Sequence, residues 1–98
     1  MTYDISEEAA NDLEDIWYYT LENWSLEQAD RYLKLVLEEI TYLAGKPEVG
    51  KDYGKVRKRY RIAKVKSHFI FYKINLKENN LIVIRVLHEM MDIESHLI

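Results

Sequence analysis

The chain has 98 residues and no cysteine, with 48% hydrophobic and 32% charged side chains. This length and composition predict one small domain, residues 1–98, that buries a core without disulfides or a cysteine-ligated metal. Neither a signal-peptide pattern nor an apolar stretch long enough to span a bilayer is recognised, which favours a cytoplasmic protein without a membrane partner.

The formal net charge of −3 conceals a separation of charge along the chain. Residues 1–45 hold eleven acidic residues against two basic ones, whereas residues 46–77 hold eleven basic residues against two acidic ones. The net charges of these two segments are therefore −9 and +9, and residues 78–98 contribute −3. Such a separation indicates a folded surface with a field of each sign, which steers partners of opposite charge.

The chain begins with a predicted strand and a predicted helix. Tyr3 and Ile5 alternate with polar neighbours, which is typical of a strand. Ser6 is a suitable N-cap, and apolar residues then recur at helical spacing. Trp17 and Trp24 lie seven positions apart, and we expect them in the core or between helices.

A second helix is expected between Ser25, its N-cap, and Gly45, after which Pro47 prevents continuation. Because so little chain separates the two helices, they must form an antiparallel hairpin. Most acidic residues lie on this hairpin. Asp12 and Asp15, like its other carboxylates, are expected on a solvated face.

After residue 54 the apolar pattern changes to that of strands. Strands are predicted at residues 59–65, 68–75 and 81–87, followed by a short helix or turn at 92–97. The predicted order is β-α-α-β-β-β-α. It defines an α+β, two-layer domain in which the helical hairpin covers one face of an antiparallel sheet and leaves the other face partly open.

Seven basic residues lie close together on a chain that is acidic elsewhere. The basic cluster consists of Lys55, Arg57, Lys58, Arg59, Arg61, Lys64 and Lys66. It is either a solvated loop and edge strand or a contact surface for phosphate or an acidic peptide, and its density favours a contact surface. Strand alternation predicts Arg59 and Arg61 on one face and Lys64 on the other.

Arg85 interrupts the apolar strand at 81–87, on the face expected for Leu81, Val83 and Leu87. A guanidinium at such a position needs a partner or a route to solvent. A salt bridge to an acid on the hairpin and an anchor for a partner's carboxylate or phosphate both remain open.

Histidine and tyrosine side chains are the candidates for chemistry and for binding outside the basic cluster. His88 ends the last strand, but the three histidines lack the spacing of metal ligands, so neither a metal site nor a cofactor is predicted. There is no nucleophile motif and no Gly-rich phosphate loop, so no catalytic residue is assigned. Tyr18 and Tyr19 cannot both share the orientation of Trp17, so we expect at least one of them to be exposed and to anchor a partner.

Segments along nearly the whole chain resemble the ParE toxins of the RelE/ParE superfamily. The loop at residues 46–50 is similar to the family's "NPELG", and residues 91–97 are similar to its closing "RMDIERHL". The other similar segments are residues 12–19, 23–24, 28–33, 59–61, 68–72 and 84–88. Where the family often carries arginine before the closing Met-Asp pair, this chain has Met90.

The resemblance implies the RelE/ParE fold and the toxin half of a bacterial type II toxin–antitoxin pair. It also implies that the toxin binds and inhibits DNA gyrase and that a ParD-like antitoxin neutralises it. We expect the antitoxin across the basic strand and beside the hairpin. The expected antitoxin-binding residues are Arg57, Arg59, Arg61, Lys64, Arg85 and Tyr18, and the expected target-binding residues are His88, Met90, Met91 and Asp92.

Two alternatives stay open. The RelE branch of the same fold cleaves mRNA on the ribosome, and in such an enzyme cations and an acid or base would support attack by the mRNA 2′-hydroxyl. That alternative assigns a catalytic role to Arg59, Arg61, Arg85 and His88. The third hypothesis is a nucleic-acid-binding module driven by the basic cluster, although the ParE interpretation predicts no direct specific nucleic-acid binding.

Overall fold

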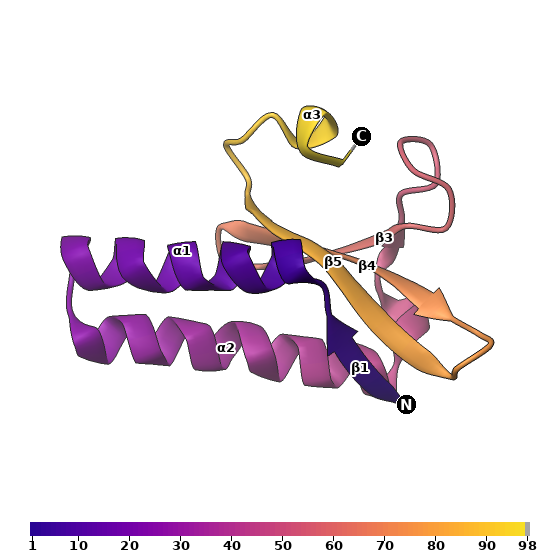
Figure 1. Ribbon diagram of the computed structural model, residues 1–98, viewed down its shortest axis with the longest axis horizontal. Coiled ribbons are helices and arrows are strands. Elements are labelled where there is room, and N and C mark those ends of the chain that lie inside the picture. The colour runs from indigo at the N-terminus through magenta and orange to yellow at the C-terminus, as the bar shows by residue number, and fades with distance from the viewer. Residues whose placement is uncertain (98) are drawn as a thin grey trace.

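The computed structural model describes residues 1–97. Its elements are β1 (Thr2–Ile5), α1 (Glu7–Asn23), α2 (Leu26–Gly45), the 3₁₀ turn η1 (Pro47–Val49), β2 (Lys51–Asp52), β3 (Arg61–Val65), β4 (His68–Asn75), β5 (Asn80–His88) and α3 (Ile93–Leu97). The antiparallel hairpin of α1 and α2 lies along the sheet, and α3 lies on the other side of β5 (Figure 1). The predicted α+β fold is confirmed. Within the described part of the chain, no helix combines the length and apolarity needed to cross a bilayer.

The five strands form one sheet in the order β1-β5-β4-β3-β2. β2 to β5 pair antiparallel, but β1 pairs parallel with β5, so the sheet is mixed rather than wholly antiparallel. The first strand therefore lies beside the last, although the helical hairpin and the other three strands separate them in the sequence. The two ends of the sequence thereby contribute adjacent strands of the sheet.

Side chains at the predicted N-caps start both long helices. The Ser6 hydroxyl accepts a hydrogen bond from the Ala9 amide at 3.0 Å, and the Ser25 hydroxyl accepts one from the Gln28 amide at 3.1 Å. Each bond satisfies an amide that has no partner within its helix. The expected end of α2 at Gly45 is also confirmed.

Apolar clusters cover both faces of the sheet. The inner cluster lies between the helical hairpin and the sheet and has Val36, Ile40, Ile70, Leu81 and Val83 among its buried members. The outer cluster lies on the opposite face, where Phe71, Leu87 and Leu97 are buried and Tyr53, Val56 and Tyr60 pack against them. The outer face is therefore more fully covered than the sequence predicted, by the 53–60 loop and α3.

β5 contains an irregularity that the sequence pattern did not predict. The register of β4 against β5 shifts by one residue, which leaves Ile84 without an opposite residue in β4. Side-chain alternation reverses at such a bulge. Val83 consequently packs in the inner cluster and Leu87 in the outer one, so the expectation that both share one face with Arg85 is wrong. Arg85 lies opposite Phe71 of the outer cluster, and so it shares a face with Leu87 but not with Val83.

Two further expectations are corrected. Arg59 lies outside β3, in the left-handed region with a φ of 70°, so strand alternation does not place it on one face with Arg61. Trp24 is 62% exposed rather than buried, because it lies at the tip of the helical hairpin. Trp17 does join the helices as expected, since its Nε1 donates a hydrogen bond to the Asp30 carboxylate at 2.9 Å.

Candidate binding surfaces

A cavity of about 870 Å³ opens between the free end of the helical hairpin and one end of the sheet. We call it the groove. Its walls come from the second half of α1, the start of α2, the turn between β3 and β4, and the segment that follows β5. The lining residues are Asp12, Asp15, Ile16, Tyr19, Thr20, Trp24, Gln28, Arg31, Tyr32, Leu35, Lys66, Ser67, His68, Val86, Leu87, His88, Met90 and Met91.

The rim of the groove holds large apolar side chains in solvent. Tyr19 is 61% exposed and Met90 is 84% exposed. The rings of Tyr19 and Trp24 lie against each other, with centroids 6.1 Å apart. Exposed aromatic and methionine side chains beside a concave surface are typical of a protein-binding site. This rim therefore marks the groove as a candidate docking site.

The floor of the groove holds a histidine that is neutral near pH 7. His68 is buried, and its Nδ1 lies 2.5 Å from the Tyr32 hydroxyl. The His88 ring lies edge-on to it, with centroids 5.0 Å apart. Burial first, and the charge of His88 second, lowers the pKa of His68 from 6.5 to about 4. The floor thus presents neutral hydrogen-bonding groups to an occupant.

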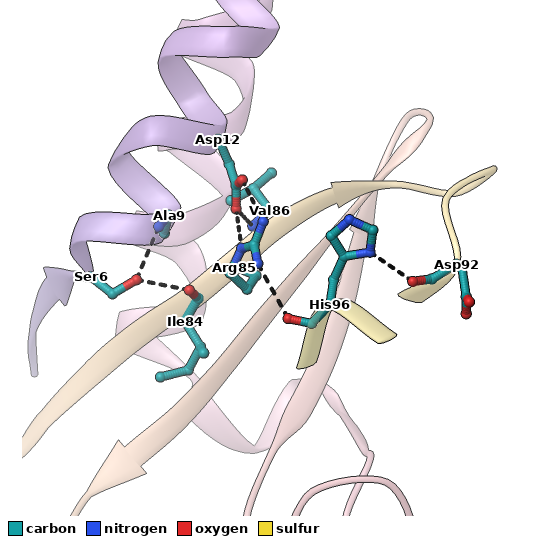
Figure 2. Close-up of polar contacts among 8 residues, drawn as sticks. All are labelled: Ser6, Ala9, Asp12, Ile84, Arg85, Val86, Asp92 and His96. Carbon is teal, nitrogen blue, oxygen red and sulfur yellow. Dashed lines mark hydrogen bonds and ion pairs between the residues drawn. The ribbon is translucent and has the colours of Figure 1, made fainter. Parts of the chain in front are cut away.

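Arg85 forms a salt bridge with Asp12 of α1, which is the first of the two readings that the sequence left open. Arg85 Nε and Nη2 donate to the two Asp12 carboxylate oxygens at 2.7 and 2.9 Å (Figure 2). These hydrogen bonds raise the pKa of the guanidinium. Arg85 Nη1 also donates to the His96 carbonyl at 3.2 Å, so one side chain connects α1, β5 and α3. Asp12 is therefore a mostly buried salt-bridge partner, and the expectation that it lies on a solvated face of the hairpin is wrong.

The residues at the start of α1 also bind backbone groups of β5 beyond the point where β1 ends, at Ile5 opposite Val83. The Ser6 hydroxyl donates to the Ile84 carbonyl at 2.8 Å, and the Val86 amide donates to Asp12 Oδ2 at 3.0 Å (Figure 2). Buried backbone groups without a partner are costly. The first turns of α1 therefore satisfy backbone groups of β5 on both sides of Arg85.

At the other end of the sheet, residues 47–50 are held by two side chains that we call the loop anchor, Tyr72 and Arg61. The buried Tyr72 hydroxyl donates to the Pro47 carbonyl at 2.8 Å and accepts from the Gly50 amide at 2.9 Å. Arg61 Nη2 donates to the carbonyls of Glu48 and Gly50 at 2.9 and 2.8 Å. A Cβ at Gly50 would lie 2.0 Å from the Tyr72 oxygen, so this close approach requires glycine.

The residues expected to bind the antitoxin do not form one surface. Arg61 and Arg85 are bonded internally, and Lys64 forms an ion pair with Glu89 at 2.9 Å. Arg57 and Arg59 lie in the 53–60 loop, which contributes nothing to the groove.

Tyr18 is exposed on α1, where its ring lies edge-on to that of Trp17, with centroids 5.2 Å apart. It is not among the lining residues of the groove. Tyr18 thus stays a predicted partner contact outside the groove.

The residues expected to bind the target lie together more closely. His88, Met90 and Met91 line the groove, and Asp92 follows directly. The Asp92 carbonyl accepts a hydrogen bond from the Ser95 hydroxyl at 3.0 Å, and this bond lies at the start of α3. Three of the four expected residues thus share the groove with the aromatic rim.

The alternative catalytic set is not assembled. Arg59 lies in the 53–60 loop, Arg61 in the loop anchor, Arg85 in the salt bridge with Asp12, and only His88 lines the groove. Among residues 1–97, no three histidine, aspartate or glutamate side chains are grouped as metal ligands. The four residues of this alternative therefore lie in different parts of the fold.

The sequence did not indicate Tyr32 and His68 as groove residues, and Trp24 was expected in the core or between the helices. Tyr19 was one of the two tyrosines of which at least one was expected to be exposed, and it is 61% exposed. For Trp24 a signal was present, because it directly precedes the N-cap Ser25 in a very short helix connection, and such connections lie on the surface. For Tyr32 and His68 there was none, since their contact joins residues 36 positions apart.

Solved structures with this arrangement of elements are toxin–antitoxin proteins. A chain from the chromosomal ParDE TA system of P. aeruginosa is similar with a TM-score of 0.78 at 14% identity, covering 90% of this chain and 95% of that one. A chain from the toxin–antitoxin complex RelBE2 of Mycobacterium tuberculosis is similar with a TM-score of 0.69 at 21% identity, covering 89% and 95%. These likenesses establish the RelE/ParE fold.

Sequence comparison then gives the family. Residues 3–93 match the family described as "ParE toxin of type II toxin-antitoxin system, parDE". The chain is 35% identical to Toxin ParE1 of M. tuberculosis and to Toxin ParE1 of Caulobacter vibrioides, over 97% of this chain and 96% of each relative. It is 32% identical to Toxin ParE of Escherichia coli, over 97% of this chain and 91% of that toxin. The chain therefore belongs to the ParE toxin family of type II toxin–antitoxin systems.

Proposed function

We propose that this toxin acts in the cytoplasm by binding and inhibiting DNA gyrase and that a ParD-like antitoxin neutralises it. The observation that carries the proposal is the groove, whose rim exposes Tyr19, Trp24 and Met90. Such a surface offers aromatic and methionine anchors, and a toxin that acts by binding needs only such anchors. Family membership supports the same class of action.

The groove also suggests how neutralisation works. An amphipathic segment of the antitoxin would place its apolar face in the groove and cover the rim. His88, Met90 and Met91, which we expect to contact the target, line the same cavity. One antitoxin segment in the groove would therefore block the target site by occupying it. This location replaces docking across β3, where Arg61 is already bonded within the chain.

The direct test is a gyrase supercoiling assay with the full chain free of antitoxin. We expect inhibition by the toxin, and relief of that inhibition by one equivalent of the antitoxin encoded beside it. A matched pair of variants locates the effect: Met90→Ser should weaken inhibition, and Leu76→Ser should not. Leu76 is equally exposed, at 87%, but lies on the turn between β4 and β5, outside the groove.

The ribosomal alternative has a separate readout. Inducing the toxin and mapping mRNA 5′ ends should show no cuts positioned by codons, because Arg61 and Arg85 are bonded elsewhere in the fold. Codon-positioned cuts together with untouched gyrase at micromolar toxin would replace the proposal with a RelE-type nuclease. Growth arrest with neither effect would point to another target.

A further inference from the structure

We propose that the 53–60 loop is a second binding surface, separate from the groove, that holds the phosphate backbone of duplex DNA. The loop carries Lys55, Arg57, Lys58 and Arg59, and all four side chains are exposed. None of them forms an ion pair or a hydrogen bond with another residue among residues 1–97. They contrast with Arg61 and Arg85, which are bonded within the fold.

The backbone of the loop is ordered by its own hydrogen bonds, so the positions from which its cationic side chains extend are fixed. The Tyr53 amide donates to the Tyr60 carbonyl at 2.8 Å, and the Tyr60 amide donates to the Arg57 carbonyl at 3.1 Å. The carboxylate of Asp52, which directly precedes the loop in sequence, accepts a hydrogen bond from the Gly54 amide at 2.8 Å. A preorganised loop loses less conformational entropy when a ligand binds.

The chemistry of the loop favours a nucleic-acid backbone over an acidic protein segment. The apolar side chains Tyr53, Val56 and Tyr60 point inward and pack in the outer cluster, so the loop offers no exposed apolar anchor. Protein interfaces depend on such anchors and are poor in lysine. Phosphate binding requires only cations, and each phosphate contact strengthens it through counterion release.

The location of the loop adds to this assignment. The loop stands at the end of the molecule opposite the connection of α1 and α2, where the groove opens (Figure 1). An occupant of the groove would therefore leave the loop accessible. The role of the loop rests on the proposed function. The loop would hold the toxin on the DNA segment that gyrase has bound, while the groove contacts the enzyme.

Two variants of equal net charge test the inference. Lys55→Gln, Arg57→Gln and Lys58→Gln are combined in the loop variant, and Lys34→Gln, Lys46→Gln and Lys77→Gln in the control variant. All six side chains are exposed, so both variants should fold, which circular dichroism checks. Fluorescence anisotropy with a 20-base-pair duplex of random sequence then measures affinity as a function of salt for the antitoxin-free chain.

We expect the loop variant to bind DNA at least about tenfold more weakly than the wild type at about 50 mM salt, with a salt slope reduced by about 3. The control variant should lose less than about threefold, since the duplex touches none of its three positions. Equal losses in both variants, or no detectable binding by the wild type, would overturn the inference. So would binding of a polyglutamate peptide through the same three loop residues with DNA left unbound.

The result of this DNA-binding test can be distinguished from the result of the gyrase test of the proposed function. Inhibition of gyrase by a chain that has no DNA affinity would overturn this inference and leave gyrase as the target. DNA affinity lost in the loop variant, in a toxin that never inhibits gyrase, would keep the loop assignment and remove gyrase as the target.

Discussion

At the end of the molecule that carries the groove, Tyr19 and Trp24 are mostly exposed; at the loop anchor, Tyr72 is fully buried and hydrogen-bonded twice. The arginines divide in the same way. The side chains of Arg61 and Arg85 donate hydrogen bonds to carbonyls and a carboxylate of their own chain, whereas the side chain of Arg57 in the 53–60 loop has no such bond among the described residues.

This difference teaches that residue type alone does not identify a binding residue in this fold. Aromatic and basic side chains whose hydrogen bonds are satisfied inside the chain stabilise the fold, and those left in solvent are available to partners. Substitutions at the bonded positions should therefore reduce stability, and substitutions at the groove rim should reduce binding. The predictions below test that division.

The largest effect on stability is expected at Asp12. Asp12→Ala removes three hydrogen bonds, leaves the Arg85 guanidinium half-buried without its carboxylate, and frees the Val86 amide. We expect a loss of about 4 kcal/mol in the free energy of unfolding, measured by urea titration. Asp15→Ala on the same helix is the control and should change stability by less than about 0.5 kcal/mol. Equal losses would mean that the salt bridge adds nothing.

Gly50 is expected to rank second. In Gly50→Ala the new Cβ would meet the Tyr72 hydroxyl at 2.0 Å and force the loop anchor apart. We expect a loss of about 3 kcal/mol from overpacking and from a broken buried hydrogen bond.

Gly45→Ala provides the matched control for Gly50, because a Cβ there has no atom within 4 Å. This substitution should be neutral or stabilise the toxin by up to about 1 kcal/mol through helix propensity. A tolerated Gly50→Ala would contradict the account of the loop anchor.

A pH effect of about 2 kcal/mol is expected from His68. Its pKa is lowered from 6.5 to about 4 in the folded chain, so between these values the unfolded chain binds the proton more strongly. Stability is therefore fully present above about pH 6.5 and falls as the pH decreases toward 4, by about 2 kcal/mol between pH 7 and pH 5. Urea titrations at both pH values should show this loss in the wild type and a smaller one in His68→Gln. A loss of the same size in both would exclude His68 as its source.

The smallest effect on stability is expected at the groove rim. Trp24→Ser should change the free energy of unfolding by less than about 0.5 kcal/mol, because the side chain is mostly in solvent. The same substitution should weaken antitoxin binding about tenfold or more, measured by isothermal titration calorimetry, since it removes an aromatic anchor. Unchanged affinity, or a loss matched by Leu76→Ser, would place the antitoxin elsewhere.

The sequence predicted most of the fold because local signals agreed with one another. Ser6 and Ser25 marked the helix starts, and the change in apolar period marked the strands. The parallel pairing of β1 with β5 and the bulge at Ile84 were not predictable in this way. The first joins the two ends of the chain and the second is a register shift between β4 and β5, and neither leaves a local pattern in the sequence.

The candidate site was predicted less completely, for a related reason. Arg85 was recognised as needing a partner, but nothing in the sequence singled out Asp12 among the acids of the hairpin. The basic cluster was read as one surface, yet its strand part is bonded within the fold and its loop part is not. Met90 and Met91 were chosen through the family resemblance, and the structure places them on the groove.

Hydrogen exchange measured on the toxin with and without its antitoxin tests the central claim most directly. The account predicts that the antitoxin protects amides at the end of α1 and in residues 86–91, around the groove, and leaves the exchange of the 53–60 loop unchanged. Protection of the 53–60 loop and β3, with the groove unaffected, would contradict it and restore docking across the basic strand.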